Sequence, residues 1–187
     1  LVAAVADDAP PDVRRAAGEL RHLSIRCVNL GVARARVTDK HWIYFPDDTI
    51  FHRVFVQGNA SPHCNPPGGF GLICEISYSR TKPLAVTGTA LIDRCMHDCI
   101  AVGLLDTSDS LLTANEVDIF HAYVIHDEGR AERVAVIREW FARFDIVLAG
   151  RFGEWEHASA DHAFIAGKKA AMAALHLGAV HAVPKRA

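Results

Sequence analysis

Gly150-Arg151-Phe152-Gly153-Glu154-Trp155-Glu156-His157 is the most informative segment of this 187-residue chain. An apolar segment at residues 146–149 precedes it, and a helix is expected at residues 162–175, capped by Ser159 or Asp161. The pattern therefore predicts a buried strand, a glycine-containing turn and a helix. Ligands of open α/β sheets bind beyond the carboxyl ends of strands, where helix N-termini offer N–H groups. The turn is therefore a candidate ligand site.

Three residues of this turn suit an anionic ligand. Gly150 and Gly153 permit close approach of the backbone. The Arg151 guanidinium can hold a phosphate or carboxylate through two parallel hydrogen bonds. The alternative is a plain strand–turn–helix in which Arg151 forms a surface salt bridge, and spacing alone favours neither interpretation.

The rest of the chain alternates strand-like segments with amphipathic helices. Asp8 is available to cap the first helix, whose Pro10-Pro11 pair is tolerated in a first turn. The turn Pro46-Asp47-Asp48 separates two strands that form a hairpin candidate. In the last of the upstream helices, the aromatic residues from Trp140 to Phe144 are expected to face inward. The expected strands are residues 22–32, 41–45, 51–57, 72–78 and 116–126, and the expected helices are residues 10–20, 89–104 and 130–144.

This order of elements predicts an α+β fold. A mixed or antiparallel sheet with packed helices would occupy residues 1–144, and the last strand and helix of an α/β domain would occupy residues 145–187. A strand–GxGxxG–helix arrangement for a dinucleotide pyrophosphate is absent from the sequence, because Gly68-Gly69-Phe70-Gly71 precedes a strand and reads as a turn.

Composition excludes several classes of protein. Half of the residues are hydrophobic and 22% are charged, which is typical of a globular domain rather than a disordered chain. The net charge of -2 and the scattered basic residues argue against a nucleic-acid partner. No apolar run approaches the ~18 residues that a membrane helix needs.

The five cysteines form no CxxC pair, which favours reduced thiols and a cytoplasmic protein. Cys95 and Cys99 fall on the apolar face of their helix, whereas His97 lies on the other side. These cysteines are therefore expected to be core thiols, and no metal site is predicted.

Two sets of motifs resemble those of the UDP-galactopyranose mutases, particularly the eukaryotic type. The first is Gly-Arg-Phe-Gly-x-Trp from residue 150, followed by Asp161 and Gly167. The second has the same order and near-identical spacing, and the likeness covers most of the chain. It comprises Trp42-Ile43-Tyr44-Phe45-Pro46, Phe51-His52-Arg53 and Asn59-Ala60-Ser61-Pro62.

The resemblance implies an FAD-dependent enzyme in which residues 1–144 bind the substrate and residues 145–187 belong to the FAD domain. Arg151 would lie at the flavin and at a substrate diphosphate, with Arg53 as a second clamp on the diphosphate. Charge-assisted bonds to phosphate are strong, which suits such a site. The flavin would also be lined by Gly150, Gly153 and Asp161, and the diphosphate would receive hydrogen bonds from Tyr44 and Tyr123.

Departures from the family pattern leave the substrate open. His157 stands where the family has Tyr after the motif Trp, and Phe-Tyr-Arg is Phe-His-Arg here. His157 could still donate a hydrogen bond to a small-molecule substrate such as a nucleotide sugar. The same scaffold serves flavin amine oxidases and protoporphyrinogen-oxidase-like enzymes, and a non-catalytic binding domain is a third alternative.

The lack of a pyrophosphate-binding motif has a consequence for the chain taken alone. We expect it to bind FAD weakly or not at all, and to be inactive by itself. We also expect it to expose apolar surface and to form homodimers or aggregates.

Overall fold

A computed structural model describes residues 8–46 and 48–180 of the chain, which form two compact units. Unit 2 is Leu23–Ala122, and unit 1 consists of the residues on either side of it. The domain boundary expected after residue 144 concerns a larger enzyme and stays a prediction. The outer ends of those two domains, residues 1–7 and 181–187, lie outside the described residues, as does Asp47 of the hairpin turn.

Unit 2 is built on a five-stranded sheet with the order β2-β3-β4-β1-β5. The pairs β1–β4, β2–β3 and β3–β4 are antiparallel. The α+β fold class and the hairpin formed by β2 and β3 are therefore confirmed. The strands are β1 (His22–Val32), β2 (Trp42–Tyr44), β3 (Arg53–Phe55), β4 (Phe70–Tyr78) and β5 (Leu111–Val124).

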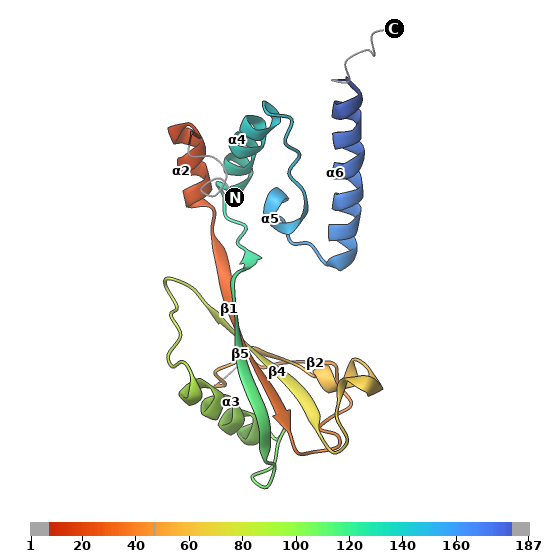
Figure 1. The fold of residues 1–187 in the computed structure, drawn as a ribbon. Coiled ribbons are helices and arrows are strands. Elements are labelled where there is room, and N and C mark those ends of the chain that lie inside the picture. Colours follow the sequence, from red (N-terminus) through yellow and green to blue (C-terminus); the bar gives the residue numbers. More distant parts are fainter. Residues whose placement is uncertain (1–7, 47, 181–187) are drawn as a thin grey trace. The chain divides into compact units, whose positions relative to one another are not determined.

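One helix, α3 (Thr89–Ala101), packs its apolar face on one side of this sheet (Figure 1). Cys95 and Cys99 are fully buried there, whereas the His97 side chain is 76% exposed. The two cysteines are core thiols, as the helical spacing predicts. The thiol of Cys74 on β4 lies 3.8 Å from that of Cys99, and neighbouring thiols together with burial raise its pKa well above the usual range.

The Pro- and Gly-rich connection between β3 and β4 contains two 3₁₀ turns, η1 (Gln57–Asn59) and η2 (Pro62–Cys64). Gly68 has a φ of 74°, which only glycine adopts without strain. The glycine-rich segment is therefore a turn that leads into β4, as expected from the sequence.

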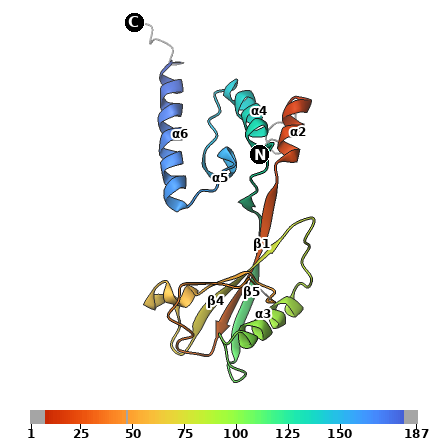
Figure 2. The same cartoon turned by 180° about the vertical axis from the view of Figure 1, so that it is seen from behind.

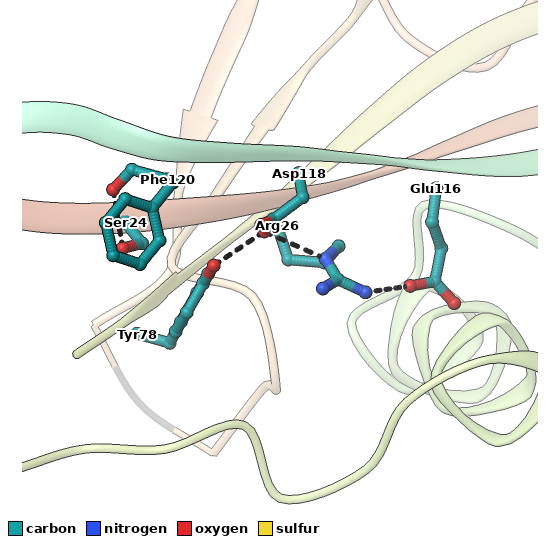
Figure 3. A network of polar contacts seen from close by, with 6 residues as sticks. All are labelled: Ser24, Arg26, Tyr78, Glu116, Asp118 and Phe120. Carbon is teal, nitrogen blue, oxygen red and sulfur yellow. Dashed lines mark hydrogen bonds and ion pairs between the residues drawn. The ribbon is translucent and has the colours of Figure 1, made fainter. Parts of the chain in front are cut away.

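A polar network fixes the register of β5 against β1 (Figure 3). Arg26 on β1 donates to Glu116 at 2.5 Å and to Asp118 at 3.2 Å, both on β5. Tyr78 on β4 donates to the same Asp118 carboxylate at 2.7 Å. Ser24, Arg26 and Asn29 of β1 bond to Phe120, Glu116 and Asn115 of β5, in that order. Residue numbers rise along β1 while those of the partners on β5 decrease, so these two strands also run antiparallel. The six residues drawn are Ser24, Arg26, Tyr78, Glu116, Asp118 and Phe120.

Unit 1 contains α2 (Pro11–Glu19) and α4 (Arg130–Ala142), which lie side by side in both views (Figures 1 and 2). Two expectations about these helices are wrong. Pro10 is the N-cap of α2 and no side chain caps it, so Asp8 does not have that role. Phe144 follows the end of α4 and is 55% exposed, so it is not part of the core. The buried cluster consists of Ala9, Val13, Ala16, Ile137, Trp140 and Phe141.

The expected strand at residues 146–149 is not formed. A strand needs a hydrogen-bonding neighbour, and in the described part of the chain this segment pairs with none of the five strands. Leu148 packs instead against the α2–α4 cluster, and Ile146 is 47% exposed. The turn that was expected next is a short helix, α5 (Gly150–Glu154), which Gly150 enters with a φ of 75°.

The final helix, α6 (Ala160–Val180), confirms and extends the helix expected at residues 162–175. Ser159 and Asp161 do lie at its start, where the Ser159 hydroxyl donates to the Asp161 carboxylate. Of the last βα element that the sequence predicts, only the helix is therefore present. Among the described helices, none combines the length and the apolar character needed to cross a membrane.

Candidate functional site

Arg53 lies on β3 between two cross-strand neighbours, Tyr44 on β2 and Glu75 on β4. Its guanidinium carbon is 4.5 Å from the centroid of the Trp42 ring and 5.6 Å from that of Tyr44. The Tyr44 hydroxyl is 3.3 Å from Nη1, and the Glu75 carboxylate forms an ion pair with Nη2. The structure thus brings the predicted pair Tyr44 and Arg53 together.

Strand alternation sets the direction of this group. Val54, next to Arg53, is fully buried in the core beneath α3. Arg53 and its neighbours therefore belong to the opposite face of the sheet, where Trp42 is 45% and Tyr44 65% exposed. A cation on an aromatic platform can bind an anion there, although Glu75 already offsets part of its charge.

His52, the residue that departs from the family's Phe-Tyr-Arg, is half-buried beside Arg53. Burial lowers the pKa of the imidazole, and the opposing effect of Glu75 is smaller. His52 is therefore neutral at pH 7. Its Nδ1 is buried and has no hydrogen-bond partner within residues 8–46 and 48–180.

Arg151 lies on α5 in unit 1 and is anchored to the backbone. Its Nε and Nη2 donate to the carbonyl oxygen of Ala158, at 3.2 and 2.6 Å. The guanidinium carbon is 5.3 Å from the centroid of the Tyr123 ring, and the His157 ring is 6.3 Å from that ring. Three of the predicted substrate residues, Tyr123, Arg151 and His157, are thus gathered in one place.

His126 lies beside this group, although its place at the end of a predicted strand favoured a surface or core role over a ligand site. Its ring centroid is 4.9 Å from that of His157, and its Nε2 is 3.5 Å from Glu156 Oε2. Arg130 holds the other oxygen of Glu156 at 2.6 Å and donates to the carbonyl of Trp155 at 2.7 Å. His126 and His157 are 31 positions apart in the sequence. The one sequence feature that could have placed His126 at this site is that it follows Tyr123 by three residues.

The remaining predicted flavin contacts have structural roles in their own unit. A Cβ on Gly153 would lie 3.3 Å from the main-chain carbonyl carbon of Leu148, so glycine allows α5 to pack on that segment. The hydrogen bond from Ser159 lowers the pKa of Asp161 at the start of α6. Contact of Gly150, Gly153 and Asp161 with a flavin stays a prediction.

Trp155 is a further residue of interest in this segment. It ends α5 with a φ of 51°, an unusual conformation for a bulky residue. Its indole Nε1 is buried and meets no acceptor in the described part of the chain. An unsatisfied buried donor costs about 1–3 kcal/mol, so this atom is suited to a ligand that carries an acceptor.

Comparison with known proteins gives a fold for most of the chain. No family model matches the sequence. A crystal structure of reduced UDP-galactopyranose mutase matches with a TM-score of 0.78 and 27% identity, over 90% of this chain. The chain shares the fold of part of a UDP-galactopyranose mutase. It spans only 37% of the length of that mutase.

A second structure matches more distantly. It belongs to a protein assigned as a protoporphyrinogen oxidase from Exiguobacterium sp. 255-15, with a TM-score of 0.63 and 13% identity. The match covers 85% of this chain and 36% of the other. At this identity it shows a common fold and no more.

Arg53 and Arg151 belong to different units, and each site is defined within its own unit. Their convergence on one ligand therefore stays a prediction. No group of three or more His, Cys, Asp or Glu side chains suited to a metal ion occurs among the described residues.

Proposed function

We propose that this chain supplies the substrate-contact sheet and part of the flavin-contact segment of an FAD-dependent enzyme that acts on a UDP-sugar. The observation that carries the proposal is the structural likeness to reduced UDP-galactopyranose mutase over 90% of the chain. The motif residues support it, since Tyr44 with Arg53, and Tyr123 with Arg151, each form a local cluster.

In this proposal the two arginines bind the diphosphate of the substrate. Arg53 is held on its ring platform by Glu75, and Arg151 is held by the Ala158 carbonyl. Both guanidinium groups are therefore oriented before a ligand arrives, which reduces the entropy lost on binding. Tyr44, Tyr123 and His157 add hydrogen-bond donors to the same phosphates.

The residues around α5 fit a flavin. The buried Trp155 Nε1 lacks an acceptor among the described residues, and the acceptor-rich edge of an isoalloxazine would supply one. Gly150, Gly153 and Asp161 would line the same ring system, and Arg151 would contact both the flavin and the substrate. When bound, reduced FAD supplies the nucleophile for the anomeric carbon of the sugar, and the protein mainly positions the two.

Binding of UDP-galactose to the full-length protein, measured by calorimetry with the flavin reduced, tests this assignment. Arg53→Ala and Arg151→Ala should each weaken binding about 10- to 100-fold, because each removes a charge-assisted bond to phosphate. Arg34→Ala is a matched control, since Arg34 pairs with Asp106 and Asp109 and with no residue named in either cluster. Equal affinity of all three variants and the parent protein would refute the proposal.

A flavin amine oxidase or protoporphyrinogen-oxidase-like enzyme would give a different result. Its flavin would bleach with an amine or similar reductant and recover with oxygen, and UDP-galactose would not bind. A non-catalytic binding domain would retain no flavin at all.

All five cysteines are free thiols in the structure, which fits a cytoplasmic enzyme.

A further inference from the structure

The Arg151 cluster extends well beyond the residues that the motifs identify. The Arg151 guanidinium carbon lies 5.3 Å from the centroid of the Tyr123 ring. The centroid of the His157 ring lies 6.3 Å from that of Tyr123 and 4.9 Å from that of His126. Glu156 lies next to His126 and is itself paired with Arg130. This row of contacts therefore begins at the Arg151 guanidinium and ends, through Glu156, at the Arg130 guanidinium, all within unit 1.

This row is accessible to a ligand. The His126 side chain is 42% exposed and that of Glu156 is 46% exposed. His157 is exposed, and Tyr123 is partly exposed. Two adjacent imidazoles in such a row can each donate an N–H, and a protonated imidazole donates from both ring nitrogens.

We propose that His126 is a specificity-determining residue of this site, which binds the anionic substrate together with His157. The proposal rests on the proposed function and deepens it by adding a residue that the motifs do not contain. His157 stands where the family has a phenol, and His126 places a second imidazole beside it. Histidine is the side chain whose charge changes near neutral pH.

The charges around the pair give the direction of the effect. Glu156 places a negative charge 3.5 Å from His126, and the positive charge of Arg130 lies on the far side of that carboxylate. Two charged rings at 4.9 Å repel each other, and a bound phosphate offsets that repulsion. Ligand binding is therefore coupled to proton uptake, and affinity should rise as the pH falls.

The experiment measures dissociation constants for the full-length protein at pH 6 and pH 8. UDP-galactose and inorganic sulfate are the probes, because both carry fixed charges across this range. We expect binding about tenfold tighter at pH 6 than at pH 8. His126→Gln should remove most of this ratio by weakening binding at pH 6, whereas His63→Gln, at an exposed position in unit 2, should leave it unchanged.

The outcomes separate the two proposals. If His126→Gln keeps the parent pH ratio for every probe that binds, the role of His126 is refuted, whether or not UDP-galactose is among those probes. If only sulfate binds, with a ratio that depends on His126, the anion site stands and the UDP-sugar assignment fails. Calorimetry in two buffers of different ionisation enthalpy should show proton uptake that His126→Gln abolishes.

Discussion

Arg53 makes contacts that have opposite consequences for anion binding. The rings of Trp42 and Tyr44 orient its guanidinium and leave its charge intact. The Glu75 carboxylate also orients it, but partly neutralises it and would repel an incoming phosphate. Glu75 is largely buried, so its field is screened by water only weakly.

Substitution of Glu75 by Gln should therefore separate stability from affinity. The carboxamide oxygen can still accept from Arg53, but the charge is gone. We expect the free energy of unfolding to fall by about 1–3 kcal/mol, while affinity for UDP-galactose rises. Urea titration and calorimetry measure the two quantities. Glu116→Gln, which acts on the Arg26 pair instead, should lower stability without raising affinity; a loss of affinity in Glu75→Gln would contradict this account.

Asp98 on α3 is a second largely buried carboxylate whose contacts can be tested. Burial opposes its ionisation, but the pKa is still lowered, because the Ile50 N–H donates to it at 2.6 Å and Arg94 at 2.7 Å. A lowered pKa in the folded state stabilises the protein above the unfolded value of about 3.9. That contribution is lost as the pH falls through the folded pKa.

Asp98→Asn should accordingly destabilise the protein by about 1–3 kcal/mol at pH 7. The difference from the parent protein should shrink as the pH falls below about 4, since the parent then loses the same charge. Thermal unfolding at pH 3 to 7 measures it. Asp106→Asn, at a side chain that is 70% exposed, should show no comparable loss; a difference that is constant with pH would exclude the charge as its cause.

Elements whose own residues decide their structure could be predicted from the sequence, and β1 and α3 illustrate this. The segment that forms β1 has apolar residues typical of a strand, and the apolar residues of α3 repeat with helical spacing. The bounds predicted from the sequence, residues 22–32 and 89–104, are therefore close to the observed His22–Val32 and Thr89–Ala101. The segment at residues 146–149 has equally strand-like residues but is irregular. Its structure depends on a neighbouring strand, and one segment's sequence carries no record of its partner.

The end of α3 depends on the backbone conformation of one glycine. Gly103 has a φ of 74°, its N–H bonds to the Ile100 carbonyl, and the Leu104 N–H bonds to the Cys99 carbonyl. This pattern is a Schellman motif, which requires the left-handed conformation at Gly103. Gly103→Ala should cost about 1–2 kcal/mol. Gly18→Ala in α2, where a Cβ meets nothing within 4 Å, should stabilise by about 0.5–1 kcal/mol.

These two substitutions share one chemical change and differ only in backbone conformation. Chemical denaturation of both variants therefore measures the conformational contribution directly. Destabilisation of equal size at both positions would show that the glycine conformation at the end of α3 does not matter.

Across the whole chain, the candidate site could be predicted only at residues to which the family resemblance assigns a role. Tyr123, Arg151 and His157 were identified and do lie together. Glu75 was not identified from the sequence. A carboxylate within a strand is indistinguishable from an ordinary solvent-facing residue until its cross-strand partner is known. A family resemblance predicts only the residues that match the family. Residues particular to this chain, such as Glu75 and His126, are recognised only when the packing is known.

The last helix leads to a prediction about association of the chain. At about 100° per residue, Phe164, Ile165, Met172 and Leu175 fall within one stripe about 100° wide on α6. These side chains are between 48% and 75% exposed. Apolar stripes of this kind mark surfaces that pack on another partner, and the chain spans 37% of the mutase that it resembles. We therefore expect the 187-residue chain alone to self-associate.

Sedimentation velocity of this chain should show dimers or larger species whose proportion rises with concentration. The double substitution Phe164→Ser and Leu175→Ser should shift the population toward monomers, because it removes the two most exposed apolar side chains of the stripe. Ala166→Ser with Ala173→Ser, on the opposite side of α6, is the control and should leave association unchanged. If the chain stays monomeric, or if both double variants behave alike, the stripe is not a packing surface and the exposed apolar residues of α6 need another explanation.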